Sequence, residues 1–271
     1  MNKLLLSLTG LVMLLTMTAC GSDEPQDNIL YLPATQMMNH SYNTVEEQLD
    51  GVKYGAVQAY INVTKKTAQL AFLCNINGES ITVQLTDAPV TFDSMNSGYV
   101  IQSTAPITVG THTVNSLRAF IEVRDIQRNL RHHVKAIIDN KYEVNGLMTS
   151  IFFNDVLTSI THDSDIDNET GSAYNFIFSD LATDNKTATM NVSGINRTPF
   201  TTGASYAGIT VEPCDVGLHL YHNEDTPINN SNGVNNQLIM FEGTINMRDL
   251  SFNVLYELEG VGIMNANGNM F

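Results

Sequence analysis

The sequence predicts an all-β protein built from two tandem antiparallel units. From Val57 to Val63 every second residue is apolar, which is the period of a strand with one buried face. Short segments of this kind recur along the chain and are separated by turn-forming residues, with Asn77-Gly78 as the strongest hairpin signal. The long helical segments that parallel strands need for their crossovers are missing. Each unit is therefore expected to be a sandwich or a lipocalin-like barrel.

Further strands are expected wherever an alternating or β-branched run lies between turn residues. In the first unit these are Ala68–Cys74, Ser80–Leu85, Tyr99–Ser103, Leu117–Arg124, His133–Ile138 and Leu147–Phe153. In the second unit they are Ala173–Phe178, Thr187–Ser193, Gly208–Val211, Gly217–Tyr221, Gln237–Met247 and Ser251–Glu259. The segment Thr44–Leu49 has the spacing of a capping box and allows a brief peripheral helix.

Short matches between the two halves suggest an internal duplication. Ala59-Tyr60 matches Ala173-Tyr174, and the segment 142–146 matches 256–260 at the same offset. Chance similarity between β-rich segments is the alternative. Two weaker matches fit the same scheme after small insertions or deletions, namely Lys66-Thr67-Ala68 with Lys186-Thr187-Ala188, and Phe92 and Tyr99 with Phe200 and Tyr206.

The first 19 residues have the organisation of an export signal. Lys3 gives a positive start, an apolar run covers Leu4 to Met17, and Thr18-Ala19 precedes Cys20. The run is too short to span a bilayer as a mature helix. The segment resembles a bacterial lipobox, although Met17 stands where that motif prefers Leu. The resemblance implies cleavage before Cys20 and acylation of its thiol.

The residues after Cys20 bear on location. Gly21-Ser22-Asp23-Glu24 resembles the signal that sends Bacteroidota lipoproteins to the outer face of the outer membrane. As a whole, the chain resembles Bacteroidota surface lipoproteins with repeated β units, a likeness that transfers no functional residues. We expect a lipid-anchored protein of the outer membrane, displayed at the cell surface. Its expected parts are a signal peptide (1–19), a tether (20–40), a first β unit (41–160), an acidic linker (161–172) and a second β unit (173–271).

Composition limits the partners. The chain has 28 acidic and 13 basic residues, for a formal net charge of −15. Such a surface repels nucleic acids and anionic lipids, so contact with the membrane is expected through the acyl chains alone. An exported location permits a disulfide between Cys74 and Cys214, with two independent thiols as the alternative.

Two short motifs could carry chemistry. Asp163, Asp165, Asp167 and Glu169 alternate along the chain, so a curled loop could turn their oxygens toward calcium, although a solvated linker explains them equally. The likeness to an EF-hand loop is partial, since it lacks the central glycine and the final glutamate. Asp93-Ser94-Met95 resembles the O-glycosylation acceptor of Bacteroidota envelope proteins, with Ser94 as the modified residue.

Other features argue against catalysis. His132 and His133 are adjacent, and neighbours on a strand point to opposite faces, so they are not expected to share a ligand. The sequence contains no GxSxG, HExxH or phosphate-binding glycine motif. We therefore expect a non-enzymatic binding or interaction module without a cofactor, for a small apolar ligand, a glycan or an envelope protein. A structural or adhesive surface subunit is the alternative, and a hydrolase ranks third.

Overall fold

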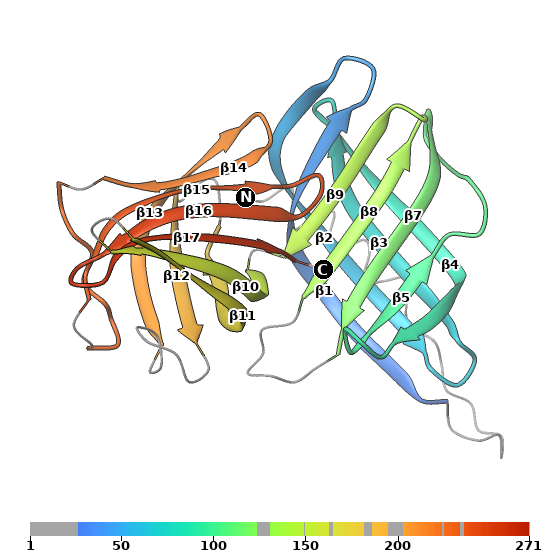
Figure 1. Cartoon of the computed structure of the whole chain (residues 1–271). Coiled ribbons are helices and arrows are strands. Elements are labelled where there is room, and N and C mark those ends of the chain that lie inside the picture. The colour runs from blue at the N-terminus through green and yellow to red at the C-terminus, as the bar shows by residue number, and fades with distance from the viewer. Residues whose placement is uncertain are drawn as a thin grey trace.

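The computed structural model describes residues 27–123, 131–148, 150–162, 165–181, 186–194, 203–223, 225–233 and 236–270. These residues form seventeen strands arranged in two antiparallel sheets that follow one another along the chain (Figure 1). The prediction of an all-β fold with two tandem units is confirmed. Within the ranges given, no helix is long and apolar enough to cross a membrane.

The first sheet closes on itself. β5 and β6 both pair with β7, along 118–122 and 112–114 respectively, so together they occupy one strand position. Because β1 also pairs with β9, the pairings form a ring. The strands are β1 (Ile29–Asn43), β2 (Gln48–Asn62), β3 (Thr67–Ile76), β4 (Glu79–Asp93), β5 (Gly98–Gln102), β6 (Ile107–Val109), β7 (His112–Glu122), β8 (His132–Ile138) and β9 (Tyr142–Met148).

The second sheet is a closed barrel in which each strand pairs with its neighbours in the chain and β10 pairs with β17. Both units are therefore up-and-down barrels, and the barrel form of the prediction holds over the sandwich form. The strands are β10 (Ile151–His162), β11 (Asp165–Ser179), β12 (Thr187–Gly194), β13 (Ala204–Cys214), β14 (Gly217–His222), β15 (Leu238–Asn246), β16 (Ser251–Leu258) and β17 (Gly262–Asn269).

Three expected boundaries were wrong. β1 begins at Ile29, so the expected tether to residue 40 already contains a strand. The change from one barrel to the other falls between Met148 and Ile151, and the expected acidic linker 161–172 lies in the β10–β11 hairpin. The polar composition of residues 161–172 wrongly suggested a linker. The hydrogen bonds between paired strands join backbone groups, so acidic side chains do not prevent the pairing.

The brief helix expected at Thr44–Leu49 is also absent from the structure. The chain turns between β1 and β2, and the side chain of Asn43 accepts hydrogen bonds from the amides of Val45 (3.1 Å) and Glu46 (3.2 Å). These bonds satisfy the amides that a first helical turn would otherwise leave free.

The barrels repeat one plan, including a long first hairpin. β2 pairs with β3 only from Ala56 onward but continues along β1 to Gln48. In the same way, β11 pairs with β12 only from Tyr174 onward but continues along β10 to Asp165. The supposed linker is thus the second barrel's counterpart of the β1–β2 hairpin tip.

One sequence match falls at equivalent places in the two barrels. Lys66 and Lys186 each precede the third strand with a positive φ (55° and 52°), and their carbonyls accept the amides of Val90 and Val211, both at 3.0 Å. The match of segment 142–146 with 256–260 joins β9 to β16, which occupy different positions in the ring. The likeness between the two units thus lies in their strand plan, to which this match does not contribute.

The two barrels share part of a core. Met38, Val52 and Leu147 belong to the first barrel but pack within the apolar cluster of the second. At the other side of the joint, Nη1 of Arg131 donates to the carbonyl of Met270 at 3.3 Å. The units are joined through buried contacts.

Candidate functional site

The site with the clearest geometry is a cavity between the two barrels. On its first side, the tip of the β1–β2 hairpin leaves the barrel wall. Side chains replace the hydrogen bonds that the wall loses there: Oδ1 of Asn39 accepts the amide of Asn75 (3.1 Å), and Nδ2 of Asn75 donates to the carbonyl of Tyr54 (3.1 Å). These bonds link the hairpin to β3 at the point where the β2–β3 ladder ends, and β2 also contacts β13 and β14 of the second barrel.

The turn between β13 and β14 forms the second side. β13 ends with Pro213 and Cys214, and Asp215 follows in the turn. Gly217 begins β14 with a φ of +147°. A Cβ on Gly217 would lie 2.4 Å from the carbonyl oxygen of Ile245, so only glycine fits this close approach. The sharp turn brings the Pro213–Asp215 segment to the hairpin.

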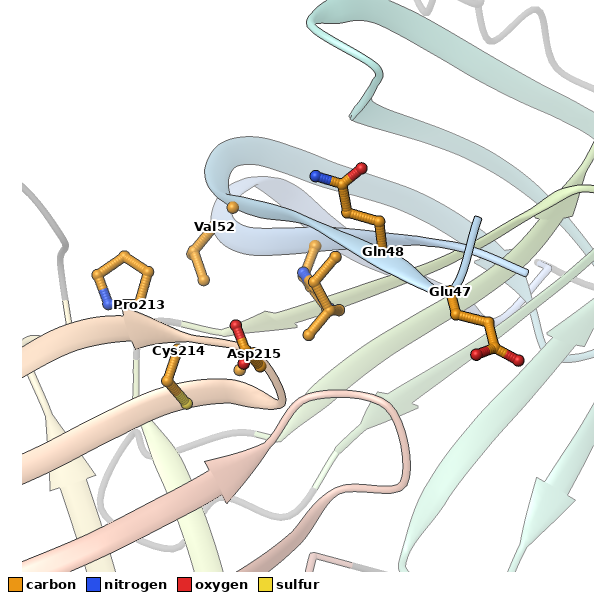
Figure 2. A pocket seen from close by; sticks show the side chains of 10 residues that line it. Glu47, Gln48, Val52, Pro213, Cys214 and Asp215 are labelled. Atoms are coloured by element: carbon orange, nitrogen blue, oxygen red, sulfur yellow. The ribbon is translucent and has the colours of Figure 1, made fainter. Parts of the chain in front are cut away.

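The cavity between these two hairpins has a volume of about 520 Å³. Figure 2 shows Val52 opposite Pro213 and Asp215, with Gln48 and Glu47 further along the β1–β2 hairpin. This volume lies in the range of small-molecule sites. The lining residues are His40, Glu47, Gln48, Leu49, Gly51 and Val52 from the first barrel, and Pro213, Cys214, Asp215 and Gly217 from the second.

His40 is the buried polar group of this cavity. It is 2% exposed, and its Nδ1 lies 2.9 Å from the carbonyl oxygen of Asp50. Burial lowers the pKa of His40 below its ordinary value, so the ring is neutral at pH 7. A carbonyl oxygen can only accept, so Nδ1 donates and Nε2 is left as an acceptor. No described residue donates to that Nε2.

The cavity is rich in hydrogen-bond acceptors. Its lining has the carboxylates of Glu47 and Asp215 and the amide of Gln48, with the ring of His40 buried beside them, while lysine and arginine are absent from the lining residues. Such a lining suits a molecule that carries hydroxyl or amino donors and disfavours an anion. No group of three or more His, Cys, Asp or Glu side chains in the described part of the chain is arranged to hold a metal ion.

Of the two alternatives for Cys74 and Cys214, the structure has independent thiols and no disulfide. Both are free thiols: Cys74 is buried in the core of the first barrel, and Cys214 lines the cavity from the second. Burial raises the pKa of the Cys74 thiol to about 12. The sequence placed the two cysteines in different units, but it did not show that Cys74 faces the core of the first barrel.

The other predicted site residues are dispersed. Cys20 and Asp163 lie outside the described residues. Asp165, Asp167 and Glu169 belong to β11, so their backbone is extended and does not form the curled loop on which the calcium hypothesis depended. Ser94 is exposed in the turn between β4 and β5, as an acceptor of a glycan would need to be.

The adjacent histidines are packed groups of β8. His132 and His133 are both buried, and burial lowers the pKa of each to about 4. Nε2 of His133 lies 3.4 Å from Oδ1 of Asn145. The two histidines are thus packed side chains of the first barrel.

No protein-family model matches the sequence, and no curated protein sequence matches it either. The function must therefore be inferred from the geometry of the site. The sequence did not point to His40, because residues 20–40 were expected to be a tether and no strand was predicted there.

Proposed function

We propose that the protein is a non-enzymatic binding module of the cell envelope that holds a glycan in the cavity between its barrels. It is anchored to the outer membrane through acylated Cys20 and displayed at the cell surface. The observation that carries the proposal is the acceptor-rich lining of a cavity of about 520 Å³, next to which Nε2 of His40 is buried without a donor among the described residues. An unsatisfied buried acceptor costs about 1–3 kcal/mol, which a ligand hydroxyl would recover once a small shift of the lining exposes Nε2.

The filling of the barrels favours this polar ligand over a small apolar one. The second barrel is occupied by a packed cluster that includes Phe153, Phe176, Phe178, Phe241 and Tyr256. The first is occupied mainly by aliphatic side chains around Phe72. Lipocalin-like binding needs an interior that side chains leave open. The inter-barrel cavity is instead lined by acceptors, which pair with sugar hydroxyls.

The state of His40 favours binding over hydrolysis. A general base needs a pKa near the working pH and a free path to the proton that it takes. Burial lowers the pKa of His40, its Nδ1 donates to the carbonyl of Asp50, and its Nε2, the nitrogen that would take a proton, is buried. This arrangement fixes the ring as a hydrogen-bond acceptor with a constant direction, which suits recognition.

Binding can be tested with the lipidated full chain and a panel of immobilised neutral oligosaccharides, followed by calorimetry with those retained. We expect at least one to bind, and His40→Phe, which removes the acceptor and fills its space, to weaken binding about tenfold or more. His219→Phe is the matched control, because His219 lies on β14 but does not line the cavity. An affinity equally insensitive to both substitutions, or a panel with no bound sugar, would contradict the proposal.

A further inference from the structure

One hairpin of the first barrel presents apolar side chains to solvent at a fixed tip. In the β4–β5 turn Met95 is 90% exposed, and Phe92, just before the turn, is 55% exposed and packs against Tyr99 with 5.1 Å between ring centroids. The carboxylate of Asp93 accepts the amides of Met95 (3.0 Å) and Asn96 (3.2 Å). These bonds order the turn with Met95 pointing outward.

This tip lies at the end of the barrel where β1 begins. Ile29 pairs with Asn62, Asn62 with Thr67 and Thr67 with Pro89, so these residues share one level across four strands. β4 continues from Pro89 to Asp93 before it turns, which at about 3.4 Å per residue carries the tip roughly 14 Å beyond that level. Figure 1 shows the start of β1 and the β4–β5 connection at the same end of the barrel.

The sequence between Cys20 and Ile29 sets how far this end can lie from the lipid anchor. About nine residues separate them, and an extended chain of that length spans at most about 30 Å. An acylated Cys20 would therefore keep this end of the barrel within about 30 Å of the bilayer surface. The tip that projects beyond the level of Ile29 is then within reach of the lipid.

Other side chains at this end also suit a lipid surface. Ile29 and Tyr31, at the start of β1, are large apolar residues that remain exposed. The β2–β3 turn carries the exposed residues Lys65 and Lys66, with Nζ of Lys65 2.7 Å from Asp27. Tyrosine and lysine are typical of the layer between hydrocarbon and water, because each combines an apolar stem with a polar end.

The opposite end of the same barrel has the reverse character. Its turns carry Glu46, Glu47, Glu79 and Asp139, and the lysine found there, Lys141, is paired with Glu46 at 3.2 Å. An acidic end is repelled by an anionic surface, so the charges and the apolar tip favour the same orientation.

We infer that the β4–β5 turn is a membrane-docking tip. Met95 and Phe92 enter the interfacial layer of the leaflet that holds Cys20, and the acidic end of the first barrel points away from the membrane. This inference rests on the anchoring in the proposed function and adds a second contact with the bilayer. It replaces the expectation that only the acyl chains touch lipid.

The chain has no tryptophan, so a single introduced tryptophan reports its surroundings without background. The lipidated full-length Met95→Trp protein would be reconstituted into phosphatidylcholine–phosphatidylethanolamine vesicles, with and without acyl-chain bromination. We expect a blue-shifted emission that loses most of its intensity with the brominated lipid. The matched control is Val45→Trp, since Val45 is 72% exposed in the turn at the opposite end. Its emission should stay that of a water-exposed indole and survive bromination.

Flotation of the vesicles and the intact mass of the protein separate the two proposals. Protein that lacks acyl chains and does not float would overturn the anchoring, and the docking with it. Acylated protein that floats, but in which Met95→Trp behaves like Val45→Trp, would overturn the docking alone. Quenching at both positions would contradict the orientation. A glycan on Ser94 of the native protein would also overturn the docking, because it would keep the tip in water.

Discussion

The two barrels follow one strand plan but are filled in different ways. The second barrel holds a cluster of aromatic rings, including Phe153 and Phe252 stacked at 4.1 Å. The first barrel has a mainly aliphatic core. Among the residues whose burial is described, which leaves out 154–155 and 157–173 of β10 and β11, it contains every buried polar or charged side chain. These are Asn39, His40, Ser41, Asn43, Gln58, Glu122, Arg131, His132, His133 and Asn145.

The position of these polar groups shows what the difference means. His40 and Asn145 are direct cross-strand partners on β1 and β9, as are Met38 and Leu147, which pack into the core of the second barrel. Part of the buried polarity therefore lies on the face of the first barrel that meets the second. The same fold thus has an apolar interior in the second barrel. In the first barrel it places polar residues at the contact between the two barrels, next to the cavity.

Removal of one ring from the second barrel should have the largest effect. Phe178 is fully buried and contacts Phe153, Phe241 and Phe252 with centroids about 6 Å apart. We expect Phe178→Ala to lower the free energy of unfolding by about 3–5 kcal/mol, because the ring leaves a cavity in a tightly packed cluster. Denaturant titration followed by circular dichroism measures this loss.

The control for that variant is a phenylalanine of the first barrel. Phe92 is half exposed, so Phe92→Ala should change the free energy of unfolding by no more than about 0.5 kcal/mol. Losses of similar size in the two variants would show that the aromatic cluster does not set the stability of the second barrel.

Acid should act on the first barrel through its buried histidines. Burial lowers the pKa of His132 and His133 to about 4, whereas an unfolded histidine titrates near 6.5. Between these values the unfolded chain binds protons that the folded chain does not, so stability falls as the pH falls. The favourable contribution is complete above about pH 6.5 and is lost progressively down to about pH 4, with at most about 3 kcal/mol for each histidine.

Nearby charges modulate these shifts. The charge of Glu122 partly opposes the lowering at His132, while Arg118 and Lys135 reinforce it at His133. Urea titrations between pH 7 and pH 4.5 should therefore show a clear loss in the native protein and a smaller one in the double variant His132→Gln/His133→Gln. A pH dependence that is the same in both proteins would assign the acid sensitivity to other groups.

Turn residues made the hairpins predictable from the sequence, whereas contacts between distant segments could not be predicted. Asn77-Gly78 does form the turn between β3 and β4, with positive φ at both residues (49° and 81°), which is the geometry that the residue pair favours. β1 was missed, because Pro33 and consecutive buried residues interrupt its alternation. That interruption has a cause in the fold, since the two faces of β1 are covered by different barrels.

The cavity could not be predicted for the same reason. It joins His40 on β1 to Cys214 on β13, and no local pattern indicates that these hairpins meet. Cys214 stood out in the sequence only as a possible disulfide partner of Cys74 or as an independent thiol. The closure of each barrel and the packing of one barrel against the other decide which residues face each other. Neither produces a short-range pattern in the sequence.

The smallest predicted loss of stability concerns β2 of the first barrel, close to this cavity. At Gly55 a Cβ would lie 2.0 Å from the carbonyl oxygen of Leu73 and 2.2 Å from Nδ2 of Asn39, whereas at Gly51 nothing lies within 4 Å. Gly55→Ala should therefore lower the free energy of unfolding by about 1–3 kcal/mol. The reason is that β2 must move at the point where the side chain of Asn39 takes the place of a backbone hydrogen bond to β3. Gly51→Ala, on the same strand, should stay within about 0.5 kcal/mol of the native protein. Denaturant titrations of both variants provide the comparison. Equal free energies of unfolding for the two variants would mean that β2 moves at Gly55 without a measurable cost. The first barrel would then not be rigid where it meets the second.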